Sequence, residues 1–145
     1  MIQRIQSVYW LLVIILTGLL FFVPLFNYGT GDNISAFTTF NCTLLSIAGG
    51  LVIAISVLAI FLFKNRSLQI KLGYLNLISL LASHMFVWVH YYFLTQGEAP
   101  ATAGDAVSIL PWVALPTVAF VFNLLAIKGV KRDEKLVKSV DRLRD

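Results

Sequence analysis

The chain has 145 residues, of which 59% are hydrophobic and only 12% charged, and its net charge is +4. Soluble domains carry charge on about a quarter of their residues, so this chain has too little polar surface for a water-soluble globule. A membrane protein is therefore the expected class, and the length allows one domain of four spanning helices. The single cysteine, Cys42, excludes an intramolecular disulfide and the paired thiols of a disulfide oxidoreductase.

Long uncharged runs predict the spans, because a helix needs about 20 apolar residues to cross the hydrocarbon core. The first run is longer than the apolar region of a signal peptide and lacks a small-residue cleavage site, so we expect a retained helix. Polar residues and turn formers predict loops at 27–40 and 95–105. The predicted spans are residues 8–26, 41–63, 72–94 and 106–127, which together form a transmembrane domain of residues 1–127.

The distribution of charge predicts the topology. All 11 lysines and arginines lie in the N-terminal segment, in the connection 64–71 or in the tail 128–145. The other two loops carry only Asp32, Glu98 and Asp105. Because cationic short loops stay in the cytoplasm, both termini and the connection 64–71 are expected there. The predicted fold is an all-α, antiparallel four-helix transmembrane bundle with a short cytoplasmic C-terminal amphipathic helix.

Small and polar residues predict which helix faces meet. In lipid, close packing and polar contacts hold helices together. Ser46, Gly50 and Ala54 form a small-residue ladder, which predicts that a neighbouring backbone approaches closely. Asn76 and Asn123 lie at similar depth on antiparallel spans, so we expect their amides to hydrogen-bond.

A polar stripe on the third span is the candidate for chemistry, because polar residues inside a membrane should face the protein interior. At 100° per residue, Asn76, Ser83 and His90 fall within an arc of roughly 60°. His84 lies near mid-membrane, where it is either a proton relay or ligand, or a neutral histidine bonded to a neighbouring helix. The candidate polar seam comprises Asn76, Ser79, Ser83, His84, His90 and Asn123.

No residue pattern supports catalysis or a cofactor. No Asp or Glu lies inside a predicted span, which disfavours proton-coupled exporters, and no hydrolase or phosphate-loop motif occurs. His84 and His90 point about 120° apart on a helix, so a shared metal is not expected and haem ligation would need a homodimer. We expect a non-enzymatic protein without a metal or cofactor.

The charged tail is predicted to form an amphipathic helix. Leu136, Val140 and Leu143 share a stripe, and Glu134 and Lys138 form a helix-supporting pair. The helix either lies against anionic lipid or docks a partner such as a protein or ribosomal RNA, although its interspersed acids argue against a specific nucleic-acid role. The candidate contacts to a partner or to lipid are Lys64, Arg66, Lys71, Lys128, Lys131, Arg132 and Lys135.

Three segments carry a family resemblance. Residues 1–9 read MIQRIQSVY, residues 61–72 read FLFKNRSLQIKL, and residues 132–144 read RDEKLVKSVDRLR. Together they resemble a family of Bacteroidota inner-membrane proteins, domain of unknown function 4293. The resemblance spans nearly the whole chain and implies a four-span protein of the bacterial inner membrane. It implies no activity, substrate or cofactor, so no site residues are carried over.

These observations favour a non-enzymatic accessory or scaffold subunit of a membrane assembly, because the segments that carry the resemblance all lie on the predicted cytoplasmic side. The alternative is a small oligomeric channel or carrier that uses the polar seam of the third span. A lipid-binding or lipid-modifying protein is a third interpretation, which lacks a nucleophile or metal site. The expected partners are anionic lipids of the inner leaflet and an unidentified inner-membrane protein or a second copy of the chain.

Overall fold

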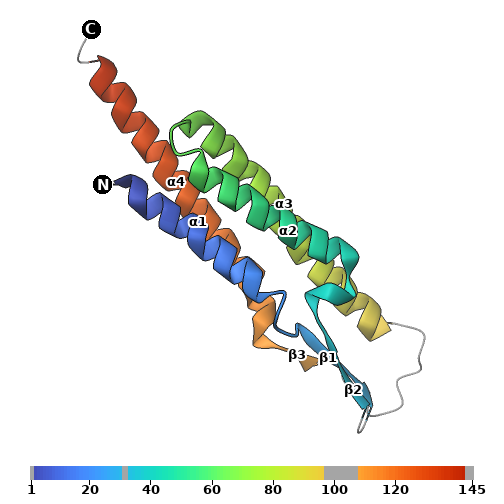
Figure 1. Ribbon diagram of the computed structural model, residues 1–145. Helices are drawn as coiled ribbons and strands as arrows, with labels where there is room; N and C mark the ends of the chain where they lie inside the picture. Colours follow the sequence, from blue (N-terminus) through green and yellow to red (C-terminus); the bar gives the residue numbers. More distant parts are fainter. Residues whose placement is uncertain (1, 31–32, 97–107, 143–145) are drawn as a thin grey trace.

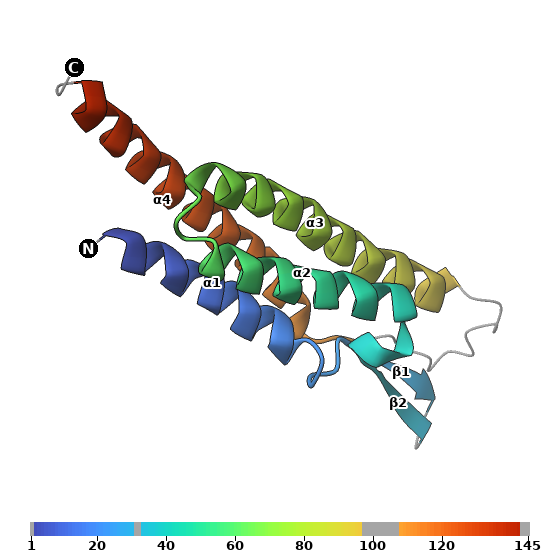
Figure 2. The ribbon, with the colours of Figure 1, turned by 45° about the horizontal axis from the view of Figure 1, so that its top comes forward.

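The computed structural model describes residues 2–30, 33–96 and 108–142 (Figure 1). Its helices are α1 (Ile2–Leu19), α2 (Thr43–Phe61), α3 (Arg66–Gln96) and α4 (Leu115–Arg142). They pack side by side, with α1 against α2 and α4, and with α3 against the same two helices. The start of α1, the end of α4 and the α2–α3 connection lie at one end, which we term the basic end, and a small sheet lies at the other, the sheet end (Figures 1 and 2).

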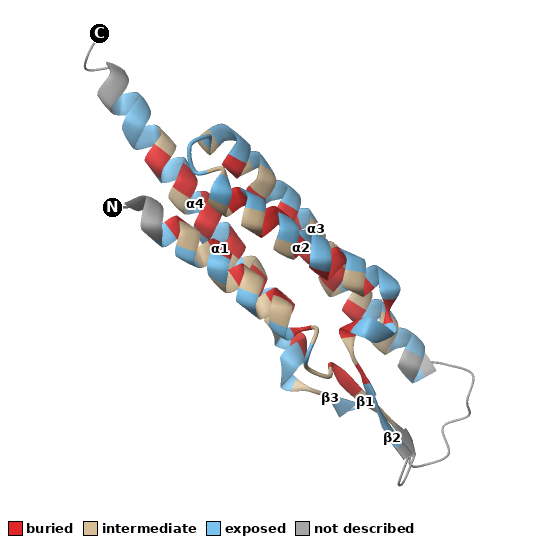
Figure 3. Cartoon of the chain, in the orientation of Figure 1, coloured by how far each residue is buried: buried red, intermediate tan, exposed pale blue. Residues whose placement is uncertain are grey.

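Apolar side chains cover much of the outer surface of the helices. Exposed residues follow the outer faces of the helices, whereas buried ones line the interior (Figure 3). A surface of this kind suits contact with lipid rather than water. Among the described residues, α1 has a shorter apolar stretch, Ile5–Leu19, and three segments are long and apolar enough to cross a membrane, namely Thr43–Phe61, Arg66–Phe93 and Pro111–Ser139.

The interior is filled by layers of side chains from neighbouring helices. The middle layer contains Val13, Val52, Leu80 and Ala119, one residue from each helix. The layer toward the basic end is built around Trp10, which is fully buried. This packing fixes which faces of the helices turn inward.

The prediction of a polar loop at 27–40 is wrong, because most of this segment forms a β-hairpin. β1 (Phe26–Thr30) pairs with β2 (Asn33–Phe37) in antiparallel register, and β3 (Ser108–Ile109) pairs with the other edge of β1. Phe26 and Phe37 face each other across the hairpin and are both buried. Their burial in an apolar cluster with α2 and α3 explains why this glycine- and asparagine-containing stretch orders as a sheet. The chain is therefore mostly helical rather than all-α.

Helix α1 ends at Leu19, earlier than the predicted span end at residue 26. Pro24 follows five residues later, and a proline cannot donate the backbone hydrogen bond that a helix requires. The next residue, Leu25, donates its N–H to the Phe37 carbonyl at 2.7 Å, so the chain has already entered the sheet.

Helix α4 differs from the prediction at both ends. The part of the predicted span that is described begins with β3, and Pro111 then opens a short 3-10 helix, Pro111–Ala114. Pro116 lies in the first turn of α4, where a missing N–H is tolerated. The helix then runs without a break through Lys128 to Arg142, so the predicted separate tail helix is a continuation of the fourth span.

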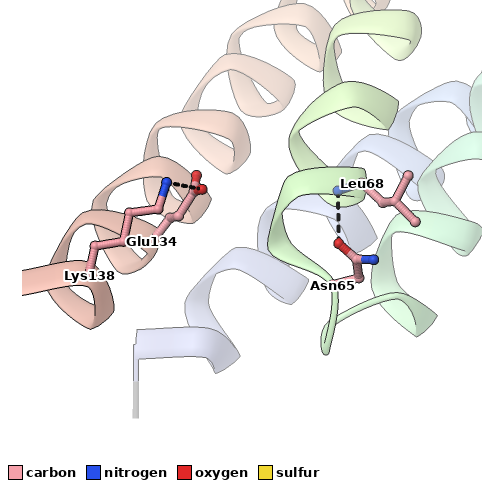
Figure 4. A network of polar contacts seen from close by, with 4 residues as sticks. All are labelled: Asn65, Leu68, Glu134 and Lys138. Atoms are coloured by element: carbon pink, nitrogen blue, oxygen red, sulfur yellow. Dashed lines mark hydrogen bonds and ion pairs between the residues drawn. The ribbon is translucent and has the colours of Figure 1, made fainter. Parts of the chain in front are cut away.

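Most of the basic connection 64–71 is helical, because α3 begins at Arg66 rather than at residue 72. The Asn65 side chain accepts a hydrogen bond from the Leu68 N–H at 3.2 Å and so caps the helix (Figure 4). One turn later, Gln69 donates to the Ala59 carbonyl at 2.8 Å, which ties α3 back to α2. The loop predicted at 95–105 lies almost wholly outside the described residues.

The expected close approach along Ser46, Gly50 and Ala54 is wrong. No atom outside the helix lies within 4 Å of a Cβ placed on Gly50, and Ala54 is exposed. The tightest approach occurs instead on α3, where a Cβ on Gly73 would lie 2.6 Å from Ile127 Cγ1. A small-residue ladder permits close packing of helices. Close packing occurs, however, only at a glycine on the face of the helix that turns toward its neighbours.

Candidate functional site

The predicted hydrogen bond between Asn76 and Asn123 is confirmed. Asn76 Nδ2 donates to Asn123 Oδ1 at 3.2 Å and to Ser56 Oγ at 2.8 Å. Asn123 Nδ2 donates in turn to the Gly73 carbonyl at 3.0 Å. All three side chains are fully buried, so the network joins α2, α3 and α4 inside the protein.

The remaining polar residues of the seam do not extend this network. Ser79 and Ser83 donate their hydroxyls to carbonyls of their own helix, at 3.2 Å and 2.9 Å. Leu80 lies between them, in the middle apolar layer. The seam residues therefore do not form a continuous polar path through the interior.

The two histidines lie apart from the asparagine network. His84 Nε2 accepts a hydrogen bond from Trp88 Nε1 at 3.0 Å. Because an indole N–H can only donate, His84 Nε2 is the acceptor in this bond. The partner is on the same helix rather than on a neighbouring one.

His90 packs against the hairpin at the sheet end. Its ring centroid lies 5.2 Å from that of Phe37, and its Nδ1 lies 3.2 Å from the Phe86 carbonyl. Within the described residues, no group of three or more His, Cys, Asp or Glu side chains is arranged to hold a metal. The histidines thus occupy two separate environments.

The sequence did not lead us to expect the buried carboxylate of Asp133 at the basic end. Gln6 Nε2 donates to Asp133 Oδ2 at 2.6 Å, and the two side chains are only 4% and 7% exposed. Gly129 makes room for this contact, since a Cβ there would lie 2.9 Å from Gln6 Cγ. The signal was present in the spacing, because Asp133 follows the buried residues Asn123, Ala126 and Val130 on one helix face.

A groove of about 950 Å³ opens between the first turns of α3 and the last turns of α4. Lys131 Nζ donates to the Tyr74 hydroxyl at 2.6 Å and lies 5.0 Å from the centre of the ring. Lys138 forms an ion pair with Glu134 at 2.8 Å (Figure 4). The lysines that line the groove are Lys71, Lys131, Lys135 and Lys138.

The groove brings together three of the seven cations predicted to contact a partner or lipid, namely Lys71, Lys131 and Lys135. Lys64 and Arg66 lie at the α2–α3 connection, beside a separate hollow of about 430 Å³. Lys128 and Arg132 are exposed on α4 and do not line the groove. The seven predicted cations are therefore divided between the groove, the α2–α3 connection and the exposed surface of α4.

A family model described as Domain of unknown function (DUF4293) matches residues 2–143. The chain belongs to this family. No curated protein and no solved structure matches the chain significantly.

The segments that carried the family resemblance meet at the basic end of this DUF4293 protein. Gln6, from the first segment, bonds to Asp133 in the third. Lys71, from the second, lines the same groove as Lys135 in the third. Residues far apart in the sequence thus build one local structure.

Proposed function

We propose that the protein is an antiparallel four-helix transmembrane bundle of the bacterial inner membrane, with both termini in the cytoplasm. Three helices have the length and composition of spans. The fourth, α1, has 18 residues, which rise about 27 Å, and its outer residues Val8, Leu11 and Ile15 are exposed apolar side chains. The cations lie toward one end of the helices, as expected for the cytoplasmic side.

Within that membrane, the protein acts as a non-enzymatic accessory or scaffold subunit that contacts an assembly through its cytoplasmic face. The observation that carries this proposal is the projection of α4, whose last turns extend beyond the other three helices (Figures 1 and 2). Leu136 and Val137 on this projection are 48% and 42% exposed, among lysines. Apolar side chains exposed on a projecting helix suit a groove on a partner protein. Of the predicted stripe, only Leu136 belongs to the described side chains.

The partner should depend on these two side chains. The tagged full-length protein, expressed at its native level, would be purified from membranes in mild detergent and its companions identified by mass spectrometry. The test variant is Leu136→Gln with Val137→Gln. The control is Phe63→Gln with Leu68→Gln, which removes two exposed apolar side chains elsewhere at the basic end. Deleting residues 131–145 is a poorer test, because it also removes the buried Asp133.

We expect a stoichiometric partner that the control retains and the α4 variant loses. Retention by both variants would contradict docking through the projection. Recovery of the protein alone, as a discrete oligomer, would contradict an accessory role and favour the alternative of a channel or carrier.

That alternative has less structural support. The asparagine network faces the interior, and Val13, Val52, Leu80 and Ala119 fill the layer beside it. A path along the seam would require this layer to separate. Flux through proteoliposomes that is abolished by Asn76→Leu, Ser83→Leu and His90→Leu would restore the alternative.

A further inference from the structure

We infer that the groove between α3 and α4 binds the phosphate group of an anionic phospholipid, in the membrane leaflet at the basic end. This inference goes beyond the accessory role, because it needs no protein partner. Binding in the groove would depend on the lysines that line it. General attraction to anionic lipid would instead depend on every surface lysine equally.

The charge of the groove suits a phosphate. Lys71 and Lys135 line it and form no ion pair with any described residue. Lys138 is already paired with Glu134. Since lysine binds phosphate as a point charge, and basic pockets between membrane helices bind lipid headgroups, the two free ammonium groups are the principal anion-binding groups.

Tyr74 adds a hydroxyl group to the lining of the groove. Its hydroxyl oxygen accepts the hydrogen bond from Lys131 at 2.6 Å, which holds that ammonium beside the cavity. A tyrosine hydroxyl can donate as well as accept, so its own proton remains available for a phosphate oxygen. The site therefore combines two cations that form no ion pair with a described residue, Lys71 and Lys135, with one cation that is hydrogen-bonded to Tyr74.

The surface next to the groove suits the acyl chains of a lipid. On α3, Ile78 and Leu81 continue the face of Tyr74 toward mid-membrane and are 64% and 50% exposed. On α4, Leu124 and Val121 continue the face of Lys131 and are 36% and 50% exposed. Acyl chains can lie along this apolar surface while the headgroup occupies the groove.

The test uses the full-length protein in detergent, titrated with phosphatidylglycerol or phosphatidylcholine and followed by native mass spectrometry. The test variant is Lys71→Gln with Lys135→Gln. The control variant is Lys64→Gln with Arg132→Gln, which removes the same charge outside the groove. Thermal unfolding of all three proteins checks that the fold is retained. A further arm adds glycerol phosphate as a soluble competitor.

We expect the groove variant to bind phosphatidylglycerol about tenfold more weakly and the control to change by less than about threefold, since each nearby cation contributes to lipid attraction. Glycerol phosphate should not displace the lipid at equal concentration. Equal losses in both variants, no loss in either, or equal binding of phosphatidylcholine would overturn the inference. Binding of glycerol phosphate in place of the lipid would overturn it in favour of a soluble phosphorylated ligand.

Discussion

Asn76 and Asn123 join α3 to α4 by a hydrogen bond of 3.2 Å between two fully buried amides. Ser56 on α2 accepts a second hydrogen bond from Asn76, so one side chain links three helices. Polar contacts of this kind hold helices together where lipid offers little hydrophobic drive for association. The network is therefore assigned to the packing of these three helices.

This assignment predicts coupling between the two asparagines. Asn76→Leu and Asn123→Leu should each lower stability, and the losses should not add in the double variant. The expected coupling energy is about 0.6–2 kcal/mol, the range for polar contacts between membrane helices. Reversible unfolding in mixed micelles measures it. Strictly additive losses would contradict a direct bond between the amides.

Two glycines should respond to alanine in opposite directions. A Cβ on Gly73 would lie 2.6 Å from Ile127 Cγ1 and 3.1 Å from Trp10 Cη2, so Gly73→Ala should cost about 1–3 kcal/mol through overpacking. Gly50 has open space around it, and Gly50→Ala should stabilise α2 by about 0.5–1 kcal/mol. Thermal unfolding of both variants checks the contrast. A more stable Gly73→Ala protein would show that this contact can relax freely.

The sequence predicted the features that follow from composition and local spacing. Uncharged runs located the helices, and the polar stripe together with similar depth on antiparallel spans placed Asn76 opposite Asn123. The hairpin could not be predicted, because Phe26 and Phe37 order it only through burial against other elements. The groove could not be predicted either, because it requires α4 to continue past residue 128 alongside α3. The burial of Asp133 could not be predicted, because the charged residues on either side of it suggest an exposed segment.

The contact between Gln6 and Asp133 predicts an asymmetric mutational response. Gln6→Leu should cost about 1–3 kcal/mol, because it leaves a buried carboxylate without this partner. The double variant, Gln6→Leu with Asp133→Leu, should be more stable than Gln6→Leu alone, since replacing both polar groups removes the unpaired charge. Unfolding midpoints of the single and double variants test this ranking. A double variant less stable than Gln6→Leu would contradict it.

The most direct test of the account is the side of the membrane on which each end lies, because the proposed cytoplasmic contact face requires four crossings. Cys42→Ser supplies a background without the natural thiol and retains an oxygen that can accept the Leu45 N–H now bonded to Cys42 Sγ. Single cysteines would then be placed at Ser35, at Ser139 and ahead of Met1, and treated with a membrane-impermeant maleimide in spheroplasts. We predict that Ser35→Cys reacts at once, whereas the other two react only after permeabilisation. Reaction of the N-terminal cysteine from outside would show that α1 does not cross, and reaction of Ser139→Cys from outside would contradict a cytoplasmic basic end.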